Sequence, residues 1–312
     1  MPLNAQTAGF LQQLADMGAK PFHTMTPTDC RVAFDTLLTA MPPSKAKVAK
    51  VEDRTIPGPS GKIAVRVYTP EGQGPFPVLV YFHGGGFVIG SLNAYDILCR
   101  ELTGGSGAVV VSVDYRLSPE HKFPAAPDDC WAATRWIASN AAELGGDASR
   151  IAVGGDSAGA NLATVTAIRA RDEGGPKLCA QLLIYPVASS GPPSKSMLEN
   201  AQGYLLEKAD MEWFVGHYVK SPMDLQDPRL APSLTKDLSR LPPALVQTCE
   251  FDPLRDEGDD YAAALKKAGT PVVHSRYEGA IHGTLCFVTA LDLGRTMLDE
   301  ETRWLREQFR RA

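Results

Sequence analysis

The sequence has few cysteines and no long apolar run. Six of the 312 residues are cysteine, they are widely spaced, and no C-x-x-C pair occurs, which argues against a zinc or thiol-exchange site. No stretch approaches the roughly 18 consecutive apolar residues of a transmembrane helix. We therefore expect no membrane span, and mostly buried thiols at Cys30, Cys99, Cys130, Cys179, Cys249 and Cys286.

An excess of positive charge is also missing. Lys and Arg total 31 against 36 Asp and Glu, which gives a net charge of −5 and argues against a general hold on nucleic acid or an anionic membrane. The first residues, MPLNAQTAGFLQQLADMG, contain no basic segment followed by an apolar one, so no secretory signal is predicted. Together these absences predict a soluble, cytoplasmic protein without a nucleic-acid or membrane partner.

What the chain does contain is an alternation of short apolar runs with segments of helical period. Such alternation is typical of βα units and predicts an α/β fold with a mainly parallel sheet. Helices are predicted over Asp256 to Ala268 and over the C-terminal segment from Leu291 to Phe309. The candidate strands are Lys62 to Tyr68, Val78 to Phe82, Ala108 to Asp114, Arg150 to Gly154, Ala180 to Tyr185, Ala244 to Cys249 and Pro271 to Tyr277.

Two regions break the alternation, and we expect them to form one helical cap. Residues 1–45 show apolar residues at helical spacing in two sets, the second after Thr26-Pro27, which predicts two helices. Residues 189–241 have no strand pattern, and an insertion there would cover the ligand-binding edge of a parallel sheet. The expected division is 1–50 and 189–241 for the cap, and 51–188 and 242–312 for the catalytic domain.

The sharpest motif is Gly155-Asp156-Ser157-Ala158-Gly159, which matches G-x-S-x-G between a predicted strand and a predicted helix. Glycines at both ends permit a tight turn that projects the Ser157 hydroxyl and leaves the Ala158 N–H free for an oxyanion. The plainer interpretation is a glycine-rich turn with an N-capping serine.

A second motif, His83-Gly84-Gly85-Gly86-Phe87, follows the strand that ends at Phe82. Consecutive glycines let neighbouring N–H groups converge on one point, as an oxyanion hole requires, although a flexible loop has the same composition. We expect His83 to support this loop by hydrogen bonding. Downstream, Arg116 and Glu120 are expected to anchor a charged turn by ion pairing.

A serine nucleophile needs a base and an acid that orients it. His282 is the best base, because it follows the last predicted strand in a glycine-flanked loop, whereas His274 lies within that strand. Asp252 is favoured as the acid because it ends a strand, while Asp256 and Glu257 read as ordinary acids of a helix N-terminus. The order Ser157, Asp252, His282 is that of the α/β-hydrolases.

The motifs HGGGF, DYRLSPEHKFPA, GGDSAGANLA, EFDPLRDEG and YEGAIHG resemble, in order and spacing, the bacterial hormone-sensitive-lipase-like esterases with a GDSAG elbow. The resemblance covers residue 60 to the end, and the N-terminal segment resembles that family's cap. It implies an eight-stranded sheet, a helical cap, and hydrolysis of small-molecule esters with short to medium acyl chains, without a metal or organic cofactor.

Carried over by position, the resemblance makes Ser157, Asp252 and His282 the triad. It assigns the oxyanion hole to the N–H groups of Gly85, Gly86 and Ala158, with His83 and Gly84 supporting the loop. Ala160 and Phe87 stand where many relatives have glycine and tryptophan. Relatives often dimerise through the last strand, so a homodimer through residues 271–277 is expected.

Other functions remain open at this point. A non-catalytic small-molecule receptor would share the fold, and an amidase, carbamate hydrolase or acyltransferase would share the triad. A dehydrogenase is disfavoured, because the segment Gly105-Ser106-Gly107-Ala108-Val109-Val110 lacks the last glycine of G-x-G-x-x-G and precedes a strand.

Overall fold

A single mixed sheet of eight strands organises the computed structural model, which describes residues 2–312. The sheet order is β1-β2-β4-β3-β5-β6-β7-β8; β2 runs antiparallel to β1 and to β4, and every other pair is parallel. The predicted α/β class with a mainly parallel sheet is confirmed. The strands are β1 Val48–Gly58, β2 Gly61–Pro70, β3 Phe76–Phe82, β4 Val109–Asp114, β5 Gly146–Asp156, β6 Leu178–Ile184, β7 Ala244–Phe251 and β8 Val272–Ile281.

The sequence analysis missed one strand and predicted several others too short, among them β5, which spans Gly146–Asp156 and not only residues 150–154. β1 carries charged residues that pair across the strand surface, including an Arg66–Asp53 ion pair with β2, so an apolar run never forms. As an edge strand it needs only one partner. The expected domain boundary at residue 50 falls inside this strand. β8 continues beyond Tyr277 to Ile281, directly before His282.

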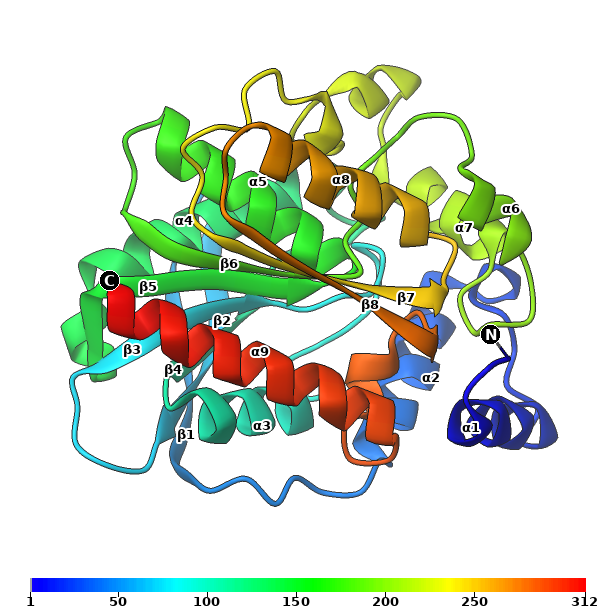
Figure 1. Cartoon of the computed structure of the whole chain (residues 1–312), viewed down its shortest axis with the longest axis horizontal. Helices are drawn as coiled ribbons and strands as arrows, with labels where there is room; N and C mark the ends of the chain where they lie inside the picture. The colour runs from blue at the N-terminus through cyan, green and yellow to red at the C-terminus, as the bar shows by residue number, and fades with distance from the viewer. Residues whose placement is uncertain (1) are drawn as a thin grey trace.

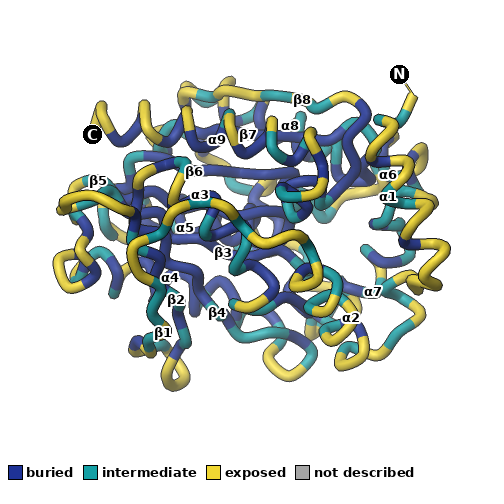
Figure 2. Tube along the Cα trace, turned by 90° about the horizontal axis from the view of Figure 1, so that it is seen from below, coloured by how far each residue is buried: buried dark blue, intermediate teal, exposed yellow. Residues whose placement is uncertain are grey.

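Helices cover both faces of the sheet (Figure 1). Two lie on one face, α3 Asp96–Ser106 and α9 Asp292–Arg311, and three on the other, α4 Ala125–Ser139, α5 Ala158–Asp172 and α8 Arg255–Lys267. The central strands between these layers are buried along their length (Figure 2). The predicted helices in residues 256–268 and 291–309 are confirmed as α8 and α9. Gly107 ends α3 ahead of β4, which is not the position of a nucleotide-binding turn.

The helices of the two segments expected to form a cap lie at the carboxyl ends of the parallel strands (Figure 1), and the name cap is kept for these segments. The cap contains α1 Ala5–Asp16, α2 Pro27–Thr39, α6 Lys195–Glu199 and α7 Lys208–Tyr218. Thr26 caps α2 as predicted, its hydroxyl accepting the Asp29 N–H at 3.2 Å. Short 3-10 turns occupy Phe22–Thr24, Ala141–Leu144, Pro222–Gln226, Pro232–Leu234 and Thr284–Phe287. Within residues 2–312, no helix has the length and apolar character needed to cross a membrane.

One hydrogen-bonded pair joins the two cap segments. The His23 backbone N–H donates to Asp210 Oδ1 at 2.8 Å, and the His23 ring Nδ1 lies 2.8 Å from the same oxygen. Asp210 is fully buried on α7 and also accepts the Glu207 N–H. Because a buried carboxylate is costly without partners, these donors fix the N-terminal segment against α7.

Candidate active site

Ser157 sits in a strained turn between β5 and α5. Its φ of 55° lies in the left-handed region, and its backbone N–H donates to Ile184 O at 2.8 Å. A Cβ on Gly155 or Gly159 would lie 2.3 or 1.9 Å from the Phe82 carbonyl oxygen, so both positions require glycine. The turn therefore projects the hydroxyl from the carboxyl edge of the sheet, as the G-x-S-x-G motif predicts.

The three residues of the predicted triad come together as one hydrogen-bonded chain. His282 Nε2 lies 2.9 Å from Ser157 Oγ, and His282 Nδ1 lies 2.7 Å from Asp252 Oδ2. The other oxygen of Asp252 accepts the Leu254 N–H at 2.8 Å, and the carboxyl group is fully buried. Each residue follows a parallel strand, β5, β7 or β8, so the sheet topology alone brings them to one edge.

The predicted oxyanion donors have unused backbone N–H groups. The backbone N–H groups of Gly85, Gly86 and Ala158 donate no hydrogen bond to any other residue in the described range 2–312. Gly85 and Gly86 have φ values of 111° and 58°, and a Cβ on Gly86 would meet the Phe214 ring at 2.3 Å. The glycines thus keep the loop close to the cap while its amides stay available.

The glycine loop is supported from below by a buried polar cluster. The His83 ring packs parallel to Tyr115 and its Nδ1 lies 2.7 Å from Gly84 O, while burial lowers the His83 pKa. The Gly84 N–H donates to Asp156 Oδ1 and to the Tyr95 hydroxyl, both at 3.0 Å. These contacts agree with the expected supporting role of His83 and Gly84. They also make Asp156 a link between the glycine loop and the turn that carries Ser157.

A second support comes from the cap. Arg31 on α2 donates from Nε to Val88 O at 2.8 Å and from Nη2 to Ser118 O at 2.8 Å, and it pairs with Glu120. Ser118 N–H in turn donates to Phe87 O at 2.9 Å. One cap side chain therefore holds both segments that flank the tip of the glycine loop.

The ion pairs expected at Arg116 and Glu120 form with partners that the sequence did not indicate. Arg116 binds the fully buried carboxylate of Asp129 on α4 through two nitrogens, each at 2.8 Å. Glu120 pairs with Arg31 at 2.7 Å, and this guanidinium lowers the Glu120 pKa to about 2. The turn is anchored to α4 on one side and to the cap on the other.

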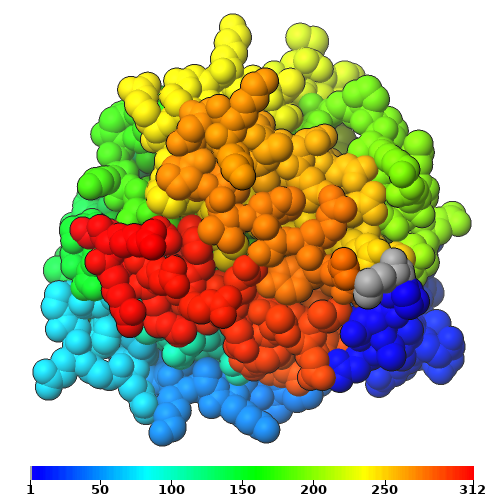
Figure 3. All heavy atoms as spheres, in the orientation of Figure 1, coloured from blue at the N-terminus to red at the C-terminus, as the bar shows by residue number. Residues whose placement is uncertain are grey.

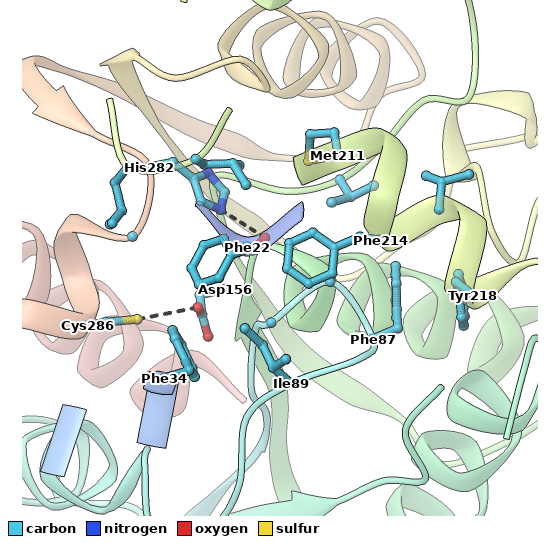
Figure 4. Close-up of a pocket in the computed structure, with 18 of the residues that line it drawn as sticks. Phe22, Phe34, Phe87, Ile89, Asp156, Met211, Phe214, Tyr218, His282 and Cys286 are labelled. Atoms are coloured by element: carbon cyan, nitrogen blue, oxygen red, sulfur yellow. Dashed lines mark hydrogen bonds between the residues drawn. The ribbon is translucent and has the colours of Figure 1, made fainter. Parts of the chain in front are cut away.

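An apolar cavity of about 90 Å³ opens onto Ser157 and His282. Figure 4 shows Phe22 and Phe34 from the N-terminal cap segment, and Met211 and Phe214 from α7, among the side chains that line the cavity with His282. The Phe87 and Tyr218 rings stack beside them with centroids 3.9 Å apart. Both cap segments thus contribute apolar side chains to the wall of the site.

Sequence reasoning missed the contacts of three residues, of which Asp156 and Cys286 line this cavity and Glu257 lies outside it. Asp156 was assigned only to the elbow, and Cys286 only to the buried thiols, yet the Cys286 thiol contacts Asp156 Oδ2 at 3.7 Å in the cavity wall. Glu257 was expected to be an ordinary helix-start acid; instead its Oε1 accepts the Ala188 N–H at 2.8 Å, and burial raises its pKa to about 8. No local motif marks these contacts, because each joins segments far apart in the chain.

The remaining histidines lie away from Ser157. His274 pairs with Asp259 at 2.9 Å on the outside of β8, and His23 binds Asp210 in the cap. His217 packs against Trp213 on α7. Of the histidines in the described chain, His282 is the one within hydrogen-bond distance of the Ser157 hydroxyl.

Comparison with known proteins agrees with this geometry. The sequence pattern of the alpha/beta hydrolase fold family matches residues 79–286. The carboxylesterase NlhH of Mycobacterium tuberculosis is 46% identical over 253 residues, which is 79% of each chain. The carboxylic ester hydrolase LipN of the same organism is 45% identical over 262 residues, 82% of this chain and 69% of LipN.

A solved structure, a hyperthermophilic esterase from the archaeon Pyrobaculum calidifontis, superposes with a TM-score of 0.94 at 45% identity. The match covers 98% of this chain and 99% of that esterase. The fold thus agrees with that of this esterase over nearly the whole chain. The chain belongs to the alpha/beta hydrolase fold family and, within it, to the hormone-sensitive-lipase-like esterases.

Proposed function

We propose that this protein is a serine carboxylesterase that hydrolyses small-molecule esters through an acyl-enzyme. The observation that carries the proposal is the Ser157–His282–Asp252 chain, with distances of 2.9 and 2.7 Å, opening into an apolar cavity beside three unused N–H groups. The relatives described above, a carboxylesterase and a carboxylic ester hydrolase, support the same class of reaction.

In the first step Ser157 Oγ attacks the ester carbonyl carbon while His282 Nε2 takes the hydroxyl proton. The carbonyl oxygen becomes an oxyanion and accepts hydrogen bonds from the N–H groups of Gly85, Gly86 and Ala158. The tetrahedral intermediate collapses when His282 gives its proton to the leaving alcohol, which breaks the ester C–O bond and leaves an acyl group on Ser157.

In the second step His282 takes a proton from water, and the hydroxide attacks the acyl carbon. Collapse releases the carboxylic acid and returns the proton to Ser157. Asp252 stays ionised and holds the His282 ring with Nδ1–H towards it, which stabilises the imidazolium in both steps. A cavity of about 90 Å³ beside Ser157 favours short acyl chains.

The test is hydrolysis of p-nitrophenyl esters from acetyl to palmitoyl by the wild type and by Ser157→Ala and His282→Ala. Each variant is expected to fold and to lose at least about 10³-fold in kcat, because the triad acts as a unit. Retained activity in either variant contradicts the assignment. An inactive but folded wild type that an organophosphate fails to label favours a receptor.

We also propose a cytoplasmic homodimer that pairs through β8. This strand is the last in the sheet order, so one side of its backbone has no strand partner within residues 2–312. Light scattering of the wild type and of a variant with proline at Val273, which is 43% exposed on β8, tests the pairing. If the wild type and the variant have the same molar mass in solution, the proposed pairing is contradicted.

A further inference from the structure

A second and larger cavity lies on the other side of α7 from the active-site cavity. Its volume is about 650 Å³, against about 90 Å³ for the cavity at Ser157. Figure 3 shows the surface hollowed beside the loop that follows β6, drawn in green, where this cavity reaches solvent. Cavities of this size are typical of small-molecule sites.

The two cavities share one wall. Phe87, Val187, Met211, Val215 and Tyr218 line both of them, so α7 forms the partition. Met211 is the flexible member of this wall, because an unbranched thioether side chain adopts many rotamers at little cost. A substrate chain longer than the small cavity at Ser157 would have to pass between these shared side chains to enter the larger one.

The larger cavity has a different chemical character from the first. The loop from Ser189 to Ser194 contributes hydroxyl groups, and Tyr218 and Tyr261 contribute aromatic surface. Lys208 and Glu212, at its α7 side, pair with each other. The remaining charged groups of the lining are the carboxyls of Glu257 and Asp260 on α8, so the cavity is acidic without a free cation among its described lining residues.

The Glu257 carboxyl group is held in place in the wall of this cavity by backbone hydrogen bonds. Its Oε1 accepts the N–H groups of Ala188 and Ser189, at 2.8 and 3.4 Å, which holds the carboxyl at the wall. Within residues 2–312 no hydrogen bond joins its Oε2 to a protein group, and the residue is part of the cavity lining. A carboxyl held in this way, with one oxygen unpaired, is suited to a ligand cation.

We propose that this cavity binds the far end of the acyl chain and that it selects esters whose acyl chain ends in an ammonium group. The proposal rests on the esterase function proposed above. The ammonium group would lie against the Glu257 carboxyl, and the Tyr218 and Tyr261 rings would contribute cation–π attraction. An anionic chain end would meet Glu257 and Asp260 and be rejected.

The charges around Glu257 set the pH dependence of this preference. The charge of Asp252 acts on it, Asp260 lies on the same helix, and the Lys208–Glu212 pair of α7 lines the same cavity. Burial, followed by the charge of Asp252, raises the Glu257 pKa to about 8. Most of its negative charge therefore appears as the pH rises from 7 to 9, and the preference for a cationic substrate should grow over that interval.

The test compares two p-nitrophenyl esters with the same alkyl spacer, one ending in trimethylammonium and the other in the isosteric tert-butyl group. For the wild type we expect kcat/KM to favour the cationic ester by about tenfold at pH 9 and by less at pH 7, as for one charge–charge contact supported by cation–π attraction. Glu257→Gln keeps the acceptor for the backbone amides and should abolish the preference. Acetate hydrolysis should be unchanged in this variant.

A second variant tests whether the preference depends on the shape of the cavity and not on its charge. Ala264→Phe narrows the cavity from α8 without altering a charge, and we expect it to slow both long esters equally while sparing acetate. Equal rates for the two esters in the wild type, or a preference that survives Glu257→Gln, would overturn the proposal. If the wild type still hydrolyses p-nitrophenyl acetate in that case, only the further inference fails and the esterase function stands. If it does not hydrolyse p-nitrophenyl acetate, the esterase function itself is refuted.

Discussion

At the scale of single residues, buried carboxyl groups in this protein differ in whether they have partners. Asp252 and Asp156 each accept at least two hydrogen bonds beside Ser157. Glu301 on α9 is also fully buried, yet in the described chain neither of its oxygens has a hydrogen-bond partner. A partnered carboxylate repays part of its burial cost, but an unpartnered one does not.

Glu301→Met should therefore stabilise the protein. Burial raises the Glu301 pKa well above its ordinary value of 4.5, so the folded state keeps a proton that the unfolded chain releases. The contribution of Glu301 to the free energy of unfolding is therefore greatest below pH 4.5. It falls as the pH rises towards the pKa that Glu301 has in the folded protein. We expect a gain of about 1–3 kcal/mol in the free energy of unfolding at pH 7, and a smaller gain at pH 4.

Urea unfolding at the two pH values measures this gain. Glu300→Met is the matched control, because the neighbouring Glu300 accepts hydrogen bonds from Tyr277 and Ser275 and its loss should destabilise. Equal destabilisation by both substitutions would show that Glu301 has a partner that the hydrogen bonds described above do not include.

At the scale of elements, the cap helix α2 reaches into the catalytic loop through Arg31. Arg31→Ala removes donors to Val88 O and Ser118 O and so frees the segments on either side of Phe87. We expect a roughly 10- to 100-fold lower kcat on p-nitrophenyl acetate with little change in KM, because small displacements of oxyanion donors are costly. A boronic acid that mimics the tetrahedral intermediate should bind more weakly by a similar factor.

Glu120→Gln is the control for this experiment. It weakens only the exposed partner of Arg31 and leaves both carbonyl contacts in place, so kcat should stay within about twofold, as for most surface ion pairs. If Arg31→Ala lowers the melting temperature but leaves kcat and boronate affinity unchanged, Arg31 holds the cap alone and does not position the loop.

The elements that sequence analysis found are those with an apolar or glycine signature. The central strands contain runs of Val, Ile and Tyr, and the turn at Ser157 and the glycine loop match known motifs. β1 was missed because Lys50, Glu52, Asp53 and Arg54 give a charged edge strand no such run. The contacts of Arg31 and Glu257 join segments that only the folded chain brings together, so a single sequence holds no local signal for them.

At the scale of the whole molecule, all six thiols are reduced and lie within or near the core. Burial raises the pKa of Cys30 and Cys99 to about 12 and that of Cys179 to about 11. Because the thiolate is the reactive form, the native protein should react slowly with a disulfide reagent at pH 8, and unfolded protein should expose six groups.

The two partly exposed thiols, Cys179 and Cys286, should react first in the native protein. Cys286 lines the active-site cavity, so an organophosphate bound to Ser157 should slow its reaction and leave Cys179 unaffected. Titration with Ellman's reagent, with and without the organophosphate, measures both rates. Fast reaction of all six groups in the folded protein would mean that the core opens readily.

The contact between His23 and Asp210 also limits how this protein can be recombined with its relatives. A chimera that exchanges only the N-terminal segment for one lacking the His23 donors would leave the fully buried Asp210 carboxylate with a single hydrogen bond, from Glu207. The two segments therefore depend on each other, although more than a hundred residues separate them in the sequence. Library design for new substrate ranges should move them as a pair.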